Sequence, residues 1–186
     1  MPSVLVICGS LRKGSFNAML TRALPALAPE GMRFTNAPRV DTIPHYNYDD
    51  QAANGFPVGV TAFADAIRAA DGVIIVSPEY NWTIPGALKN AIDWVSRMKE
   101  QPFKDKPVAL QSASGALLGG SRMQYHLRQS LTSIDALIFG RPEVIVTFAP
   151  QKFDEATLEL KDQATRDMIK LQLAAFAKFI ERVRGT

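Results

Sequence analysis

Residues able to bind an anion follow an apolar segment near the start of the chain. Residues 9–17 place serine hydroxyls, an asparagine amide and an arginine directly after the apolar residues 4–8. This order predicts a strand, a loop and the start of a helix, where N–H groups and the positive end of the helix dipole converge. Such a loop suits a phosphate, which Ser10, Arg12 and Asn17 would also contact. The alternative is a helix-capping loop with a solvated arginine.

Two better-known phosphate-binding loops do not fit these residues. A Walker A loop requires a lysine between its last glycine and the next Ser or Thr, whereas Ser15 follows Gly14 directly. The dinucleotide fingerprint requires a glycine where Leu11 stands, and a side chain there would block the approach of a pyrophosphate. Gly9 and Gly14 are expected to let the backbone turn tightly. The loop therefore fits a single terminal phosphate better than a diphosphate.

A second unusual segment follows the apolar residues 73–76. It contains a proline, a carboxylate, an amide and two aromatic residues: Pro78, Glu79, Tyr80, Asn81 and Trp82. The aromatic side chains offer flat faces against which a planar ring can pack. Glu79 and Asn81 are expected to hydrogen-bond the backbone of their own loop, which leaves neighbouring N–H groups for a ligand. The alternative is a structural turn whose aromatic residues cover the edge of the core.

A third segment, residues 112–120, is rich in serine and glycine. We expect unobstructed N–H donors there, although a plain flexible loop would have the same composition. One loop thus suits a phosphate, another suits a planar ring, and the third suits the polar edge of that ring. Flavin mononucleotide (FMN) has these three parts, and N–H groups beside its N1 and O2 atoms would stabilise the reduced ring.

These loops require a fold that brings them together. Apolar strand patterns alternate with helical patterns: strands at 4–8, 32–35, 73–76, 107–111 and 144–148, and helices at 18–28, 60–70, 87–98, 121–134 and 160–184. The fully apolar segment 73–76 is typical of a strand buried on both faces, which favours a parallel sheet between helices. We predict an α/β, doubly wound, five-stranded parallel sheet in the order 2-1-3-4-5. The loops after the first, third and fourth strands then lie together.

Four further features carry local expectations. Pro25 is expected to kink or end the first helix. The polar residues 36–57 form too long a connection to be idle, so we expect them to border a site or an interface. His45 is expected at the surface of that segment. Cys8, at the end of the buried first strand, is expected to act as a small hydrophobe rather than as a nucleophile.

Composition narrows the classes of protein. The 186 residues, 47% of them hydrophobic, are expected to form one domain spanning residues 1–186. No apolar stretch of about 18 residues and no basic leader is present, which predicts a cytoplasmic protein without a membrane segment. The single cysteine agrees with a reducing compartment. A formal net charge of +3 without a run of Lys or Arg argues against nucleic-acid binding, and no metal site is predicted.

Three segments together resemble the NADPH-dependent FMN reductase family, in particular its chromate and quinone reductases: residues 9–17, 78–81 and 85–94. The similarity continues through residues 124–129 to the last helix and covers nearly the whole chain. It implies a flavodoxin-like fold, non-covalent FMN, and reduction by NADPH or NADH. It also implies two-electron transfer to quinones, with azo dyes, chromate or other metal oxyanions as looser acceptors, and a homodimer or homotetramer.

The resemblance implies roles for individual residues as well. The FMN phosphate and ribityl chain are expected to contact Ser10, Arg12, Ser15, Phe16 and Asn17. The ring is expected to lie against Pro78, Glu79, Tyr80, Asn81 and Trp82, with Ser114 and Gly115 at its pyrimidine side. Trp82 stands where relatives often carry a smaller side chain, and it is expected to narrow the acceptor pocket. A polar network at a subunit interface is expected from Arg122, Tyr125 and Glu143.

The predicted reaction is a ping-pong hydride transfer that needs no acid or base from the protein, so no catalytic residue is assigned. Ser112 and Ser114 lack the nucleophile elbow of a hydrolase, and neither His45 nor His126 has a visible partner. The main alternative is a one-electron carrier or a flavin-sensing protein that acts through a protein partner. Such carriers tend to be acidic, and the basic chain favours the enzyme. A nucleotide-binding module without FMN is a third alternative.

Overall fold

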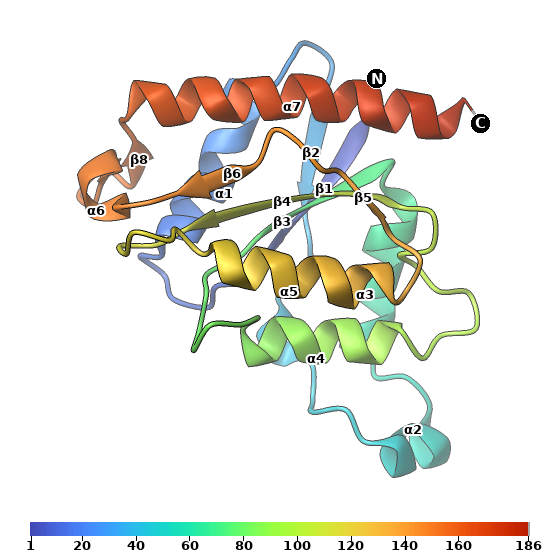
Figure 1. Cartoon of the computed structure of the whole chain (residues 1–186). Coiled ribbons are helices and arrows are strands. Elements are labelled where there is room, and N and C mark those ends of the chain that lie inside the picture. Colours follow the sequence, from blue (N-terminus) through green and yellow to red (C-terminus); the bar gives the residue numbers. More distant parts are fainter. Residues whose placement is uncertain (186) are drawn as a thin grey trace.

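A parallel sheet forms the centre of the computed structural model, which describes residues 1–185 (Figure 1). The strand order is β2-β1-β3-β4-β5, and β6 also pairs with β4. The six strands of this sheet are β1 (Ser3–Cys8), β2 (Arg33–Asn36), β3 (Gly72–Val76), β4 (Pro107–Ala113), β5 (Leu137–Ile138) and β6 (Val144–Val146). The predicted order 2-1-3-4-5 of a doubly wound parallel sheet is confirmed.

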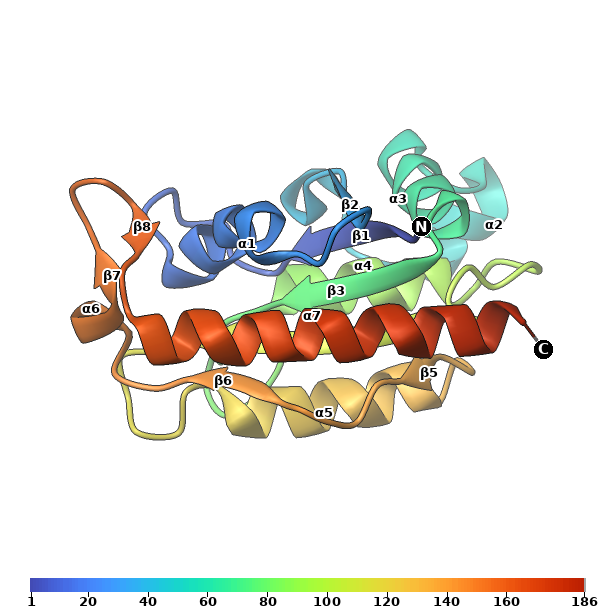
Figure 2. The same ribbon diagram turned by 90° about the horizontal axis from the view of Figure 1, so that it is seen from above.

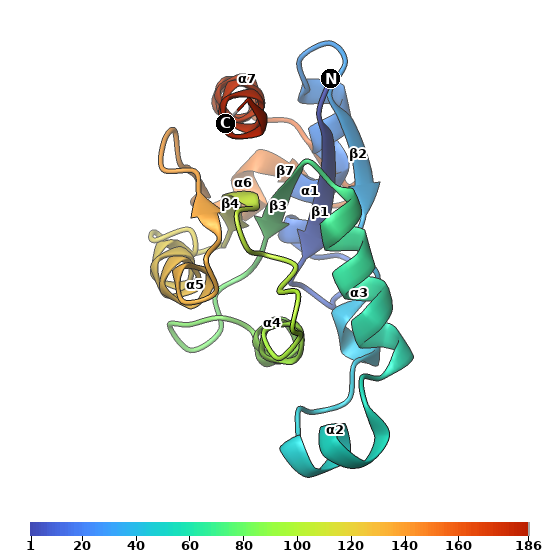
Figure 3. The same ribbon diagram turned by 90° about the vertical axis from the view of Figure 1, so that its right-hand side faces the viewer.

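Helices cover both faces of the sheet (Figures 1 and 3). The helical segments are α1 (Phe16–Leu27), η1 (Val40–Thr42), α2 (Tyr48–Asn54), α3 (Val58–Ala69), α4 (Gly86–Val95), α5 (Ser121–Thr132), α6 (Ala149–Lys152) and α7 (Gln163–Arg184). Alternate residues of each central strand enter two separate cores. Leu5 and Ile7 of β1 join the core beneath α3, α4 and α5, whereas Val4 and Val6 join the core beneath α1 and α7.

The edge position for which one strand was predicted, residues 144–148, is occupied by two short strands in the structure. β5 pairs with the start of β4 and β6 pairs with its end, so that two short strands share one edge position. The residues between them include Gly140 and Pro142. Proline has no N–H to donate and glycine weakens an extended strand, which accounts for the interruption.

Other helix ends also differ from the predictions. Pro25 lies inside α1, which continues to Leu27 and is capped at its start by the Ser15 hydroxyl, 3.2 Å from the Asn17 N–H. The closing helix begins at Gln163 rather than at residue 160. Leu160 belongs instead to a short hairpin, β7 (Phe153–Asp154) and β8 (Glu159–Leu160), that the sequence did not predict.

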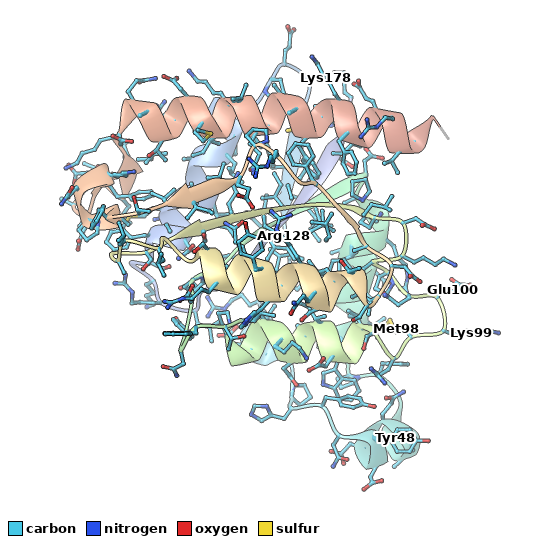
Figure 4. The ribbon with its side chains drawn as sticks, in the orientation of Figure 1. Tyr48, Met98, Lys99, Glu100, Arg128 and Lys178 are labelled. Atoms are coloured by element: carbon cyan, nitrogen blue, oxygen red, sulfur yellow. The ribbon has the colours of Figure 1, made fainter. Side chains whose placement is uncertain are left out.

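The polar residues 36–57 form an arm that is anchored in the core by Val40 and Ile43 and whose helix α2 extends from the body of the molecule (Figure 1). Its helix α2 has no buried residue, and Figure 4 shows Tyr48 at the outer end. The base of the arm is bound to α4, because the Trp94 indole N–H donates to the Pro44 carbonyl (2.8 Å) and Asn90 accepts from the Tyr46 N–H (2.8 Å). His45 is exposed, as predicted.

The carboxyl ends of the strands lie at one end of the molecule. Figures 1 and 2 show there the loops after β1, β3, β4 and β6, together with α6 and the β7–β8 hairpin. This is the edge at which open α/β sheets bind ligands. None of the helices in the described residues is both long and apolar enough to cross a membrane.

Candidate functional site

The three loops singled out in the sequence line one cavity of about 190 Å³. The loop after β1, the loop after β3 and the end of β4 each contribute to it, and the lining residues are Ser10, Arg12, Ser15, Phe16, Asn17, Pro78, Glu79, Tyr80, Ala113 and Ser114. Arg12 and Tyr80, 68 residues apart in the chain, therefore lie on the same cavity. Of the predicted contact residues, Asn81, Trp82 and Gly115 lie outside this lining.

The first loop approaches the second very closely. A Cβ on Gly9 would collide with the Ser77 hydroxyl and lie 2.9 Å from Ser77 Cβ. The Gly9 N–H donates to the Val76 carbonyl at 2.9 Å, which fixes the two loops together. Gly9 is therefore required because the two loops leave no space for a side chain. Gly14 is not, because its Cβ would meet only Arg12 Nη1, at 3.6 Å.

Some polar side chains of the first loop already make hydrogen bonds within the protein, whereas others remain free for a ligand. Ser15 is buried and caps α1, whereas Arg12 is exposed, with its guanidinium 5.9 Å from the Phe16 ring. Asn17 is 3% exposed and exchanges two hydrogen bonds of 2.9 Å with the backbone of Ala113. An amide has two N–H hydrogens, so Asn17 joins α1 to β4 and keeps one donor for a ligand.

The second loop is a tight reversal. The N–H of Tyr80 donates to the carbonyl of Thr83 (3.1 Å), and the N–H of Thr83 donates back to Tyr80 (3.0 Å). The two residues between them, Asn81 and Trp82, have φ values of 47° and 70°. Such values occur in type I′ hairpin turns, where Gly is usual and a tryptophan is strained. The loop thus holds a large aromatic residue in an unusual backbone conformation.

The Trp82 side chain lies against an arginine of α5. Trp82 is 68% exposed, and the Arg122 guanidinium lies 4.3 Å from its ring centre. Glu79 accepts a hydrogen bond of 2.6 Å from Arg122 Nε and another of 3.2 Å from the Met123 N–H. The prediction that Glu79 bonds its own loop is therefore wrong. Its carboxylate instead joins the second loop to the positive N-terminus of α5, where a negative charge is stabilised.

The third loop has fewer free donors than predicted. The N–H of Ser114 is bonded to the Val146 carbonyl (3.0 Å), and its hydroxyl accepts from the Ala116 N–H (3.2 Å). The Gly115 N–H has no acceptor among the described residues, and Gly115 itself is exposed. The expectation of unobstructed N–H groups is therefore wrong for Ser114 and correct for Gly115.

Buried amide side chains at the end of β4 were not predicted. Gln111 and Ser112 are fully buried on this strand. The Gln111 amide donates to Gln172 Oε1 of α7 (2.8 Å), and the Ser112 hydroxyl accepts from the Gln124 amide of α5 (2.8 Å). Gln172 also donates to the Pro142 carbonyl (2.9 Å) and Gln124 to the Val144 carbonyl (2.9 Å). The only signal in the sequence was the pair of polar residues at the end of an apolar strand.

The predicted interface network is arranged differently in the structure. Arg122 pairs with Glu79, as above, whereas Glu143 pairs with Arg128, whose guanidinium lies 5.9 Å from the Tyr125 ring. Figure 4 labels Arg128, which lies between α5 and the edge of the sheet. Arg122, Tyr125 and Glu143 therefore do not form a single network within one chain.

Two isolated side chains have contacts that the sequence did not indicate. His126 has a partner, because its Nδ1 lies 2.9 Å from the Thr83 hydroxyl. Cys8 is partly exposed rather than buried, and its thiol lies 3.7 Å from the Ser10 carbonyl. Neither was visible in the sequence, because each depends on contacts between loops.

The donors around the cavity fit FMN. Hydroxyls, an amide hydrogen and a guanidinium gather on the first loop, where a phosphate would accept hydrogen bonds. Pro78 and Tyr80 provide flat surfaces for a ring. Gly115, whose N–H has no acceptor among the described residues, directly follows the lining residue Ser114. At about 190 Å³ the cavity is smaller than a usual cofactor pocket, so a nucleotide would extend beyond it toward the exposed Trp82.

Comparison with known proteins agrees with this geometry. The model of the NADPH-dependent FMN reductase family matches residues 2–151. The quinone reductase of Escherichia coli is 49% identical over 181 residues, covering 97% of this chain and 96% of that protein. An NAD(P)H-dependent FMN reductase of Pseudomonas aeruginosa is 44% identical over 182 residues, covering 98% and 97%.

A solved structure agrees as well. The flavoenzyme NAD(P)H:(acceptor) oxidoreductase FerB of Paracoccus denitrificans superposes with a TM-score of 0.87 at 32% identity, covering 98% of both chains. The extent of these matches is sufficient to establish the relationship. The chain belongs to the NADPH-dependent FMN reductase family.

Proposed function

We propose that this protein is an FMN-dependent NAD(P)H oxidoreductase that reduces quinones by two-electron transfer. One observation carries the proposal: the three loops with the chemistry for a phosphate, a planar ring and a ring edge line a single cavity. The relatives named quinone reductase and NAD(P)H-dependent FMN reductase support it, since each matches almost the whole chain.

The first loop would hold the phosphate and ribityl chain. Ser10, Arg12 and Ser15 present donors to the cavity, and Phe16 and Asn17 complete that side. Arg12 is suited to a dianionic phosphate because its guanidinium makes charge-assisted, paired hydrogen bonds. Asn17 contributes its one remaining amide hydrogen and also fixes α1 to the end of β4.

The second and third loops would hold the ring. Pro78 and Tyr80 would pack against it, and the exposed Trp82 would restrict which acceptors reach it. Glu79 anchors the loop to α5, and Asn81 lies in its tight turn, beside the ring. Gly115 and Ser114 lie at the pyrimidine side, where the free Gly115 N–H is placed to donate. When bound, FMN supplies the redox chemistry by accepting a hydride from NAD(P)H and reducing the quinone.

No side chain of the site needs to act as an acid or a base. Glu79 is the only carboxylate that lines the cavity in the described residues, and it is committed to Arg122 and the Met123 N–H. The role of the chain is to bind and orient both substrates and to stabilise negative charge on the reduced ring.

The proposal extends to the location, the acceptors and the assembly of the protein. The chain acts as one domain in the cytoplasm, and its acceptors extend to azo dyes, chromate and other metal oxyanions. It forms a homodimer or homotetramer, in which exposed apolar side chains such as Tyr125, 54% exposed, would be covered. Light scattering during size-exclusion chromatography tests the assembly.

Rapid mixing under anaerobic conditions tests the function. The FMN-loaded protein is mixed with NADPH, and the flavin absorbance is expected to bleach in one two-electron phase and to return when a soluble benzoquinone is added. Steady-state rates at several quinone concentrations are expected to give the parallel double-reciprocal lines of a ping-pong reaction. A flavin that stays oxidised until a partner protein is added would instead identify a one-electron carrier or a sensor.

A further inference from the structure

A second cavity adjoins the candidate FMN site. It has a volume of about 270 Å³ and lies beside the carboxyl ends of β1 and β2. Ser10 and Arg12 line both cavities, so the two are neighbours on either side of the first loop. The arm that follows β2 forms the far wall with Ala37 and Arg39, so part of the long polar segment borders this cavity.

The second cavity is strongly basic. Arg12, Lys13, Arg22 and Arg39 line it from three different segments: the first loop, α1 and the arm. No acidic side chain lines it in the part of the chain that the structure describes. The nearest balancing charge is Asp41, which pairs with Arg39 through hydrogen bonds of 3.0 and 2.5 Å. An excess of positive charge therefore faces the cavity.

Most of the remaining wall is apolar, with Ser10 and Asn36 as further polar lining residues. Leu11, Ala37, Pro38 and Val40 present carbon surface beside these cations. A ligand that matches this surface has an apolar or aromatic body and a compact group with two negative charges. Guanidinium groups bind phosphate oxygens in pairs and also stack on flat rings, so a nucleotide phosphate satisfies both features.

We propose that this second cavity binds the adenosine 2′-phosphate of NADPH and makes the protein prefer NADPH to NADH. The two coenzymes differ only in that phosphate, so a discriminating site must supply cations for it. The proposal rests on the proposed function. The shared Arg12 places the cations beside the loop that would hold FMN, close enough for one dinucleotide to engage both regions.

Coenzyme kinetics of the FMN-loaded protein test the proposal. The test variant combines Arg22→Gln and Arg39→Gln, because neither residue lines the candidate FMN cavity. Loss of two charge-assisted contacts is expected to lower kcat/KM for NADPH about 10-fold or more, through KM, and to leave the value for NADH unchanged. The control is Arg33→Gln, an exposed arginine at the opposite end of β2.

A binding measurement gives a readout independent of turnover. Calorimetric titration with adenosine 2′,5′-bisphosphate, which represents that half of NADPH, is expected to show tighter binding than adenosine 5′-monophosphate, which represents NADH. The difference is expected to disappear in the double variant and to persist in the control. Equal binding of both nucleotides, or binding of inorganic phosphate as tight as that of the bisphosphate, would overturn the proposal.

The outcomes separate this inference from the proposed function. If the wild-type protein oxidises both coenzymes with equal kcat/KM, the function stands and the NADPH site is refuted. If it oxidises neither coenzyme, the proposed function fails, whereas the nucleotide titration still decides whether the cavity recognises a 2′-phosphate.

Discussion

Gly9 shows how a single residue can determine whether two loops meet. It follows β1 directly and lies against the start of the loop after β3, where a side chain would collide with Ser77. Leu88 of α4 would lie 3.0 Å from the same added atom, so neither neighbour has room to move. The absence of a side chain at this position brings the phosphate loop and the ring loop together.

We expect Gly9→Ala to destabilise the protein by about 1–3 kcal/mol, the usual effect of overpacking a filled interior. Gly14→Ala is the matched control in the same loop, because its added methyl group would meet only the end of the Arg12 side chain. It is expected to change stability by less than about 0.5 kcal/mol. Urea unfolding of both variants measures the effect, and equal stabilities would contradict this account of Gly9.

The sequence predicted which residue types would gather at the site but not how each would be bonded. Ser10, Arg12 and Tyr80 lie on the cavity as expected, because strand order alone brings their loops together. Glu79 and Ser114 bond to α5 and to β6 instead of serving the expected local roles. These partners are more than 30 residues away, and only the folded chain brings them close.

At the scale of elements, the long helix α7 begins with a strong cap. Asp162 accepts hydrogen bonds from the hydroxyl (2.5 Å) and the N–H (2.8 Å) of Thr165. These two bonds lower the pKa of Asp162 below its ordinary value. A carboxylate at this end of a helix is further favoured by the helix dipole. The cap fixes where α7 leaves the β7–β8 hairpin and turns back over the sheet.

Asp162→Ala is expected to cost about 0.5–2 kcal/mol of stability at neutral pH, the usual effect of losing an N-cap. Because the folded-state pKa is lowered, the stabilisation is present above the unfolded pKa of about 3.9 and is lost as the pH falls through the folded value. Unfolding experiments from pH 7 to pH 3 should show the two proteins converging. Asp167→Ala, an exposed carboxylate on the same helix, is the control. A pH-independent difference would contradict the ionic cap.

Two buried glutamines replace backbone pairing where the edge strand is divided. The amides of Gln172 and Gln124 donate to the carbonyls of Pro142 and Val144, on opposite faces of the sheet. Each also bonds a side chain at the end of β4, and thereby holds the strand that leads to Ser114. The sequence shows that Gln111 is an unusual polar residue in an apolar strand. It does not show that Gln172 of α7 is its hydrogen-bond partner.

Gln172→Leu keeps the volume of the side chain and removes its hydrogen bonds. Because the buried Gln111 amide and the partly buried Pro142 carbonyl then lose their partner, we expect a loss of about 1–3 kcal/mol. Gln129→Leu, at an exposed position of α5, is expected to have little effect. Thermal unfolding followed by circular dichroism compares the two, and an unchanged Gln172 variant would show that water replaces the amide.

The two short strands β5 and β6 show which elements could not be predicted from the sequence. Val144 to Val146 was recognisable as apolar, and the interruption by Gly140 and Pro142 has an ordinary cause. Leu137 and Ile138 were too short a stretch to indicate a strand by periodicity. The hairpin before α7 escaped notice for the same reason. The order of the remaining strands was predictable because their apolar runs and connecting helices are long.

In the whole molecule, positive side chains gather at the same end as the carboxyl ends of the parallel strands. The formal net charge is +3, and four cations gather in the cavity beside the first loop. The carboxyl ends of the parallel strands and the N-terminus of α1 also face this end. A positive field at the site attracts anionic substrates over distances comparable to the Debye length, about 10 Å at 0.1 M salt.

We expect kcat/KM for NADPH to fall as ionic strength rises, because salt screens this attraction. For an uncharged benzoquinone and the same protein, kcat/KM should change little between about 20 mM and 500 mM salt. The higher concentration screens most of the attraction between the protein and a charged substrate. Steady-state rates at each concentration measure both. Equal salt dependence for the two substrates would show that the positive charges do not guide the coenzyme.

The central claim is that the three loops form one FMN site with the phosphate on the first of them. Its most direct test is the binding of FMN and of riboflavin, which lacks the phosphate, to the flavin-free protein, followed by quenching of flavin fluorescence. The account predicts one FMN bound per chain, about 10-fold or more tighter than riboflavin because of charge-assisted bonds, with the advantage lost in Arg12→Gln and kept in Arg33→Gln. Equal affinity for the two flavins, or an Arg12→Gln variant that binds FMN as well as the wild type, would contradict it.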